Sequence, residues 1–254
     1  MTGRASPEHA RGVVVLRQGT WDYHTKGPST GRYYPADFEP EWIETIERVT
    51  PFTITTAERL AALCQATEYV VRAGIPGSFV ECGVWRGGSM MAVALTLRRL
   101  GVADRDLYLF DTFSGMTRPT EEDVDPLAGV RYLDYWPFPA HGFDSVPLEE
   151  VEAALASTGY EPERLHFIPG RVEETLPDRA PSQIALLRLD TDWYESTLHE
   201  LTHLYPRLGS GGVLIVDDYG HLAGARKATD EYLARKRILL DRIDYTGRIG
   251  VKQA

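Results

Sequence analysis

From about residue 55 onward, the chain alternates short, continuously apolar segments with amphipathic segments of helical period. The five apolar segments read SFVEC (78–82), DLYLFD (106–111), LHFI (165–168), IALLRLD (184–190) and VLIVDD (213–218). Strands that are apolar on both faces are typical of a parallel sheet covered by helices on both sides. The pattern therefore predicts an α/β fold.

Two further extended segments follow near the C-terminus. The stretch RILLDRIDYTGRIGVK, residues 237–252, contains the turn pair Thr246 and Gly247. A turn pair between two extended segments predicts an antiparallel hairpin. Together, the segments predict a mostly parallel seven-stranded sheet with an antiparallel C-terminal hairpin and helices on both faces.

The N-terminal 50 residues differ from the rest of the chain. Residues 1–36 mix glycine, proline, charged and aromatic residues without any period. The order of such a segment depends on what it packs against. We therefore expect an arm and a short helix over residues 1–50, contacting another subunit of a homo-oligomer. Residues 51–254 are expected to form one domain.

The charge balance restricts the kind of partner. Acidic residues outnumber basic ones, 37 against 27, for a net charge of −10. Nucleic acid and anionic membranes repel such a surface, so a small molecule is the expected partner. Cys64 and Cys82 lie in apolar stretches without metal-ligand or disulfide-framework spacing, and the apolar run at residues 13–16 is too short for a signal sequence or membrane span. We expect a cytoplasmic protein with reduced core cysteines.

Acidic side chains gather where the predicted strands end. Asp111, Asp190 and the pair Asp217 and Asp218 all occupy such positions. In an open α/β sheet, the ligand lies outside the carboxyl ends of the strands. Asp190, Asp217 and Asp218 would offer a cation only oxygen ligands, which suits Mg²⁺ or Mn²⁺ better than Zn²⁺. Alternatively, one of them caps a helix and the others are solvated; for Asp192, before WYESTL, we favour a helix cap.

A glycine loop follows the first predicted strand. The sequence ECGVWRGGS contains Gly83, Gly87 and Gly88 directly before a predicted helix. It is neither a Walker loop nor a dinucleotide-binding pattern, and a plain tight turn is the alternative. With Asp111, 28 positions after Gly83, it indicates an adenosine-containing ligand without a pyrophosphate. S-adenosylmethionine fits, with its amino-acid moiety on the loop, its ribose on Asp111 and its adenine beside residues 170–172.

Five stretches carry a resemblance to a known family. They are FVECGVWRGGSMMAVALTL, DLYLFDTFSGM, LHFIPGRVEETLP, LRLDTDWYESTL and VLIVDDYG, in this order. The chain resembles the macrocin O-methyltransferase, or TylF-type, sugar O-methyltransferases from about residue 52 to 251. The resemblance implies a Rossmann-like class I methyltransferase fold, S-adenosylmethionine and magnesium as cofactors, and methylation of a deoxysugar hydroxyl in antibiotic biosynthesis. It also implies that Asp190, Asp217 and Asp218 are the metal ligands.

We predict that the cofactor is contacted by residues at the ends of the first four parallel strands. They are Glu81, Gly83, Val84, Trp85, Arg86, Gly87, Ser89, Asp111, Thr112, Phe113, Gly170, Arg171, Val172 and Asp190.

Methyl transfer to a sugar needs a positioned, deprotonated oxygen. Sugar hydroxyls hold their protons tightly at neutral pH, and a cation that binds two adjacent hydroxyls lowers the pKa of one and orients it. Asp190 would reach both metal and hydroxyl and is the predicted general base. His141 and His221 are alternatives, and for each a surface or supporting role is the competing interpretation.

Residues 112–146 form a long insert without a clear helical or strand period, which indicates a lid or an acceptor site. Aromatic rings suit the apolar faces of a sugar or a macrolide-like aglycone. The predicted acceptor-binding residues are Tyr132, Tyr135, Trp136, Phe143 and Tyr219. The rings, Phe138 among them, could equally form a small core under the loop. We expect the insert to be partly disordered without ligand.

Two other classes of function stay open. Asp190, Thr191 and Asp192 form the Asp-x-Asp pattern of metal-dependent glycosyltransferases, although that interpretation leaves the glycine loop and Asp111 without a role. A non-catalytic, cofactor-binding subunit is the other alternative. The expected acceptor is either a glycosylated small molecule or a nucleotide sugar.

Overall fold

The computed structural model describes residues 13–17, 20–26, 32–137 and 145–253. Its centre is a seven-stranded sheet in the order β6-β5-β4-β7-β8-β10-β9. The strands are β4 (Ser78–Cys82), β5 (Leu107–Asp111), β6 (Leu165–Pro169), β7 (Ile184–Leu189), β8 (Leu208–Val216), β9 (Asp241–Arg242) and β10 (Arg248–Val251). The first five are parallel, and β10 pairs antiparallel with both β8 and β9. The predicted α/β sheet with its C-terminal hairpin is confirmed.

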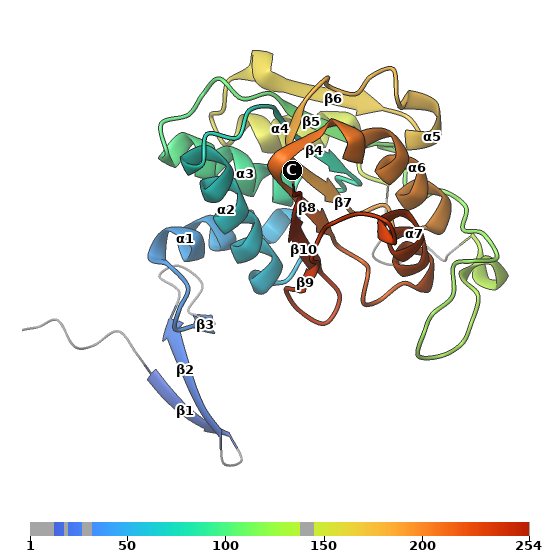
Figure 1. Cartoon of the computed structure of the whole chain (residues 1–254). Helices are drawn as coiled ribbons and strands as arrows, with labels where there is room; N and C mark the ends of the chain where they lie inside the picture. The colour runs from blue at the N-terminus through green and yellow to red at the C-terminus, as the bar shows by residue number, and fades with distance from the viewer. Residues whose placement is uncertain (1–12, 18–19, 27–31, 138–144, 254) are drawn as a thin grey trace, which may run out of the picture.

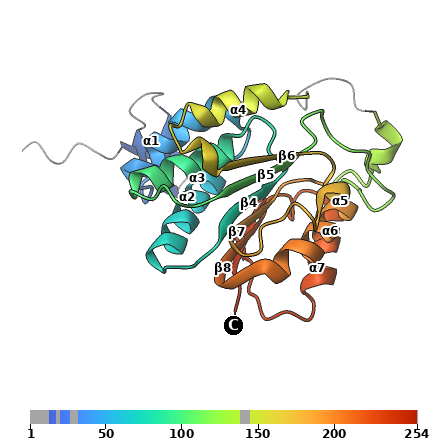
Figure 2. The same ribbon diagram turned by 90° about the horizontal axis from the view of Figure 1, so that it is seen from above.

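Helices cover both faces of this sheet (Figure 2). One face carries α1 (Pro40–Val49), α2 (Ala57–Arg72), α3 (Gly88–Arg99) and α4 (Leu148–Ala156); the other carries α5 (Val172–Thr175), α6 (Tyr194–Leu204) and α7 (Ala223–Leu233). Short 3-10 turns complete the domain: η1 (Thr50–Phe52), η2 (Tyr132–Tyr135), η3 (Pro162–Arg164) and η4 (Tyr205–Arg207). Two covered faces explain why the central strands are apolar throughout.

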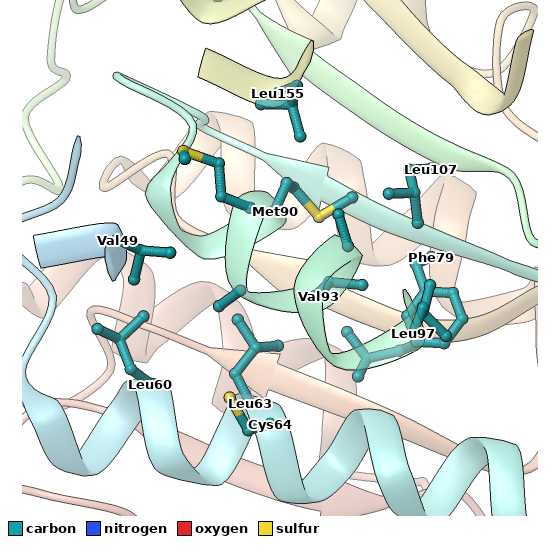
Figure 3. Packing of buried hydrophobic residues seen from close by; sticks show 14 of the residues in the cluster. Val49, Leu60, Leu63, Cys64, Phe79, Met90, Val93, Leu97, Leu107 and Leu155 are labelled. Atoms are coloured by element: carbon teal, nitrogen blue, oxygen red, sulfur yellow. The ribbon is translucent and has the colours of Figure 1, made fainter. Parts of the chain in front are cut away.

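The larger hydrophobic core lies between the sheet and α1 to α4. Met90 and Val93 of α3 belong to one cluster with Leu63 and Cys64 of α2 and Phe79 of β4 (Figure 3). All five side chains are at most 2% exposed. Burial of large apolar side chains such as these contributes about 1.5–3 kcal/mol each to the stability of the fold. This core therefore holds the central strands, whose ends carry the site, in a fixed position.

The N-terminal segment contains three strands that the sequence pattern did not predict. They are β1 (Val13–Arg17), β2 (Thr20–Lys26) and β3 (Tyr33–Pro35), paired antiparallel in a separate sheet. Figure 1 shows β1 and β2 projecting away from the seven-stranded sheet. The predicted contact of this arm with another subunit stays a prediction. Within the described residues, no helix combines the length and the apolar character needed to cross a membrane.

Both cysteines are free and buried. Burial raises the pKa of the Cys64 thiol to about 11 and that of Cys82 well above its usual value. Both thiols are therefore protonated at about pH 8, where an ordinary cysteine is partly ionised. We expect Ellman's reagent to leave both unmodified in the native protein. Unfolded protein, the control, should react at both; reaction of either thiol before unfolding would contradict this burial.

Candidate functional site

A cavity of about 670 Å³ opens at the carboxyl ends of the parallel strands. Every one of these strands contributes, through the glycine loop after β4, Asp111, residues 170–173, residues 190–193 and the pair Asp217 and Asp218. Residues 53–55 before α2, residues 245–246 before β10 and parts of the insert, such as Met116 and Tyr132, also line it. The cavity has the size and position expected for a small-molecule site in this fold class.

The glycine loop is packed directly against the end of β7. Gly83 has φ +82°, and a Cβ there would overlap the carbonyl oxygen of Asp190. The amide of Asp190 donates to the carbonyl of Cys82 at 2.8 Å. Trp85 adopts φ +47°, and Gly87, at φ +86°, is the N-cap residue of α3. Glycine is therefore required at position 83 both for backbone conformation and for space.

Gly83→Ala is expected to lower the free energy of unfolding by at least about 2 kcal/mol, because overlap and left-handed strain add together. Urea unfolding measures this loss. Gly101→Ala is the matched control, since Gly101 has φ +71° but an added Cβ would meet nothing within 4 Å. Equal losses in the two variants would show that the contact with Asp190 is unimportant.

Asp111 organises two loops at the rim of the cavity. Its Oδ2 accepts from the amides of Val84 (2.6 Å) and Trp85 (3.0 Å), and its Oδ1 accepts from the amide of Phe113 (2.8 Å). The Thr112 hydroxyl also lies 3.4 Å from Oδ1, but its one proton has a closer acceptor in the Gly115 carbonyl, at 2.5 Å. A carboxylate has room for about four such bonds, so one acceptor position remains. The predicted ribose contact stays possible for this side chain, which lines the cavity.

A buried arginine, which the sequence analysis did not single out, lies under the acidic side chains. Arg188 of β7 is 3% exposed. Its Nη1 donates to Glu81 (2.5 Å) and Asp190 (2.7 Å), and its Nη2 donates to Asp217 (2.5 Å). The other oxygen of Asp217 pairs with Arg59 of α2. The sequence could have predicted this network, since an arginine inside the apolar run IALLRL is buried and a buried guanidinium needs acidic partners.

Three carboxylates meet at the cavity floor. One oxygen each of Asp190, Asp192 and Asp218 lies within 4.8 Å of the other two. Burial and the neighbouring aspartates raise the pKa of Asp190 and of Asp218 well above the usual value, and burial raises that of Asp192 to about 7. Asp218 Oδ2 is buried and has no hydrogen-bond partner among the described residues. This oxygen-rich cluster, in which Asp190 also pairs with Arg188, has the donor chemistry of a magnesium or manganese site.

The third carboxylate of the cluster is Asp192 rather than Asp217. We expected Asp192 to cap α6, and this was wrong. Its φ of +72° turns the chain so that it faces the cavity, and the N-cap residue of α6 is Trp193, without a side-chain cap bond. The amide of Tyr194 instead donates to Asp123, 71 positions upstream (2.8 Å). Both oxygens of Asp217 are engaged by arginines.

The remaining predicted residues divide into two groups. The first group lines the cavity: Val84, Trp85, Ser89, Thr112, Gly170, Arg171, Val172, Tyr132 and His221. The second group does not line it: Glu81, Arg86, Gly87, Phe113, Tyr135, Trp136 and Tyr219. Of the second group, Glu81 is buried against Arg188, Phe113 packs into the core, and Tyr219 bonds Asp230 through its hydroxyl (2.8 Å). The Arg86 guanidinium stacks on Trp85, and the Tyr135 side chain is largely solvent-exposed. His141, Phe143 and Phe138 lie outside the described residues.

The described part of the insert, residues 112–137, is tied to α6 and α7. The buried carboxylate of Asp123 accepts from the amides of Thr120 (2.7 Å) and Tyr194 (2.8 Å). Gly224 of α7 leaves space for it, since a Cβ there would overlap Asp123 Oδ1. The Trp193 indole donates to the carbonyl of Thr117 (2.9 Å). The insert thus has a fixed base beside the cavity; its predicted partial disorder without ligand stays a prediction.

The chain is similar in sequence and in structure to known O-methyltransferases. The family described as macrocin O-methyltransferase (TylF) matches residues 43–249. The 8-demethyl-8-(2,3-dimethoxy-alpha-L-rhamnosyl)-tetracenomycin-C 4'-O-methyltransferase of Streptomyces olivaceus is 37% identical over 197 residues, covering 77% of this chain and 73% of the relative. The mycinamicin III 3''-O-methyltransferase of Micromonospora griseorubida is 34% identical over 187 residues, covering 73% and 72%. The solved structure of the O-methyltransferase NovP matches with a TM-score of 0.70 and 32% identity, covering 80% of this chain and 83% of NovP.

Proposed function

The chain belongs to the macrocin O-methyltransferase family, and from this membership we propose that it transfers a methyl group from S-adenosylmethionine to a sugar hydroxyl in antibiotic biosynthesis. The observation that carries the proposal is the convergence of the glycine loop, Asp111 and the three-carboxylate cluster on one cavity. The names of two relatives, a rhamnosyl-tetracenomycin and a mycinamicin methyltransferase, support a glycosylated small molecule or a nucleotide sugar as acceptor. Family membership favours this function over the glycosyltransferase and non-catalytic alternatives.

S-adenosylmethionine would lie along the β4 and β5 ends of the cavity. Gly83 and the loop after it allow close backbone approach, and Asp111 retains acceptor capacity for a ribose. The Trp85 indole N–H is buried and has no hydrogen-bond partner among the described residues, and this residue lines the cavity. An unsatisfied buried donor costs about 1–3 kcal/mol, so a bound acceptor atom would stabilise this loop.

Asp190, Asp192 and Asp218 would hold the cation, Mg²⁺ or Mn²⁺. Asp218 Oδ2 has no hydrogen-bond partner in the part of the chain that the structure describes, and this oxygen and the close approach of the three carboxyl groups fit a divalent ion. When bound, the ion supplies Lewis acidity that lowers the pKa of a sugar hydroxyl. In place of the expected Asp217, this set contains Asp192, because the carboxylate of Asp217 is committed to Arg59 and Arg188.

Asp190 is the proposed general base. It lies in the cluster that lines the cavity, and its contact with Arg188 fixes the side chain. Asp192, in the same cluster, is the alternative proton acceptor. His221 lines the cavity but packs its ring on Tyr245, at 5.8 Å between centroids.

We also propose that the enzyme is homo-oligomeric and cytoplasmic.

Calorimetric titration tests the cofactor and the reaction class together. The full chain is titrated with S-adenosylmethionine and, in parallel, with UDP-glucose, each in Mg²⁺ and again in EDTA. We expect S-adenosylmethionine to bind in both buffers, because the carboxylate cluster serves the acceptor. If S-adenosylmethionine gives no binding heat and UDP-glucose binds only in Mg²⁺, the proposal is overturned in favour of a glycosyltransferase.

A further inference from the structure

A carboxyl group that does not line the cavity is buried behind its acidic cluster. Glu200 of α6 is 0% exposed. Its Oε1 accepts from the hydroxyl of Thr191 at 2.8 Å. Its Oε2 is buried and has no hydrogen-bond partner among the described residues. Burying a carboxyl group is costly, so an apolar side chain would suit this position better unless the bond to Thr191 has a purpose.

Thr191 occupies a special place in the site. It is the residue between Asp190 and Asp192, two of the three clustered carboxylates, and it lines the cavity itself. The chain reverses sharply here, with Asp192 in the left-handed region at φ +72°. Aspartate adopts this region more readily than most residues, but the conformation is uncommon and persists where surrounding contacts maintain it.

Each part of this turn is fastened to a different neighbour. The amide of Asp190 donates to Cys82 (2.8 Å), and the carbonyl of Thr191 accepts from the Trp193 amide (2.8 Å) and the Ser196 hydroxyl (3.3 Å). These contacts hold the backbone. The side chain of Thr191 donates to Glu200, so Glu200 holds the side chain of the residue that links Asp190 to Asp192.

The contact with Thr191 depends on an accepting oxygen of Glu200. Burial raises the pKa of Glu200 well above the usual value, which favours the neutral carboxyl group. A neutral carboxyl group still accepts through its carbonyl oxygen, which glutamine also provides. Glutamine at this position is therefore expected to keep the hydrogen bond.

We propose that Glu200 is a positioning residue: by holding the Thr191 hydroxyl, it sets the separation and direction of the Asp190 and Asp192 carboxylates and so the affinity of the site for a divalent cation. The inference rests on the proposed function, in which these carboxylates bind the cation. Residues that orient metal ligands typically contribute about 10–100-fold to metal affinity.

Binding of Mn²⁺ to the full chain, followed by electron paramagnetic resonance without acceptor, tests the proposal. Thr191→Val removes the hydroxyl at nearly constant volume and is expected to weaken Mn²⁺ binding about tenfold. Glu200→Gln keeps the accepting oxygen and is expected to bind Mn²⁺ like the wild type. Thr202→Val, at an exposed position of the same helix, is the control. Binding of S-adenosylmethionine and the melting temperature are measured for each variant.

The outcomes separate the inference from the proposed function. A loss confined to Thr191→Val, with S-adenosylmethionine binding retained, supports the positioning role. Mn²⁺ affinity in Thr191→Val within about threefold of wild type, or a loss in Glu200→Gln as large as that in Thr191→Val, overturns it. Absence of Mn²⁺ binding in the wild type would overturn the proposed cation site and this inference together.

Discussion

Asp190→Asn is expected to lower kcat about 10³-fold while leaving the Kd for S-adenosylmethionine within about twofold of wild type. Asparagine keeps the shape of the side chain, and the backbone amide of residue 190 still donates to the Cys82 carbonyl. The asparagine side chain, however, carries no charge and takes up no proton. A positioned base contributes about 10²–10⁴-fold to a rate, and the same change removes one of the three clustered carboxylates. Single-turnover methyl transfer and calorimetry measure the two effects separately.

Two further variants define what this result means. Asp241→Asn, at an exposed position of β9, should behave as wild type. Asp192→Asn is compared with Asp190→Asn at saturating Mg²⁺, where loss of cation affinity is compensated. The larger residual loss then identifies the proton acceptor. Unchanged methylation by Asp190→Asn would remove Asp190 from the mechanism.

Arg188→Leu is expected to lower the free energy of unfolding by about 3–5 kcal/mol, the range for a buried ion pair that loses one partner. The guanidinium is the shared partner of Glu81, Asp190 and Asp217. Leucine fills much of the space but leaves these acidic groups facing one another in a buried site. Urea unfolding followed by fluorescence measures the loss.

The charge explanation has its own control. Adding Glu81→Gln to Arg188→Leu neutralises one stranded carboxyl group and should recover part of the lost stability. Arg235→Leu, at an exposed position, should change stability by no more than about 0.5 kcal/mol. If the double variant is as unstable as Arg188→Leu alone, packing rather than charge explains the effect.

The sheet could be predicted from the sequence because continuous apolar runs between helices have few other solutions. SFVEC and IALLRL became β4 and β7 with nearly the predicted bounds. The strand-end carboxylates also met, since parallel strands end at one edge. The pairing of β1 to β3 was not predictable from an irregular segment whose strands depend on one another rather than on local period.

Within the site, the types of residue could be predicted from the sequence, but the directions in which their side chains point could not. Asp192 looked like a helix cap, because its left-handed backbone is set by packing around the turn and not by its neighbours in sequence. The actual cap, Asp123, comes from the insert 71 positions away. Arg188 was read as part of a strand, although its charge inside an apolar run required the acidic partners that it has.

The close packing of Asp123 on Gly224 affects any attempt to change acceptor specificity by grafting the insert from one homologue into another. A grafted insert brings its own carboxylate at position 123, and that carboxylate fits only where the recipient helix has no side-chain carbon at position 224. A chimaera that moves residues 112–137 into a recipient with alanine at that position would push Asp123, and the insert with it, away from α7. Insert and glycine therefore form one exchangeable module, although a hundred residues separate them in the chain.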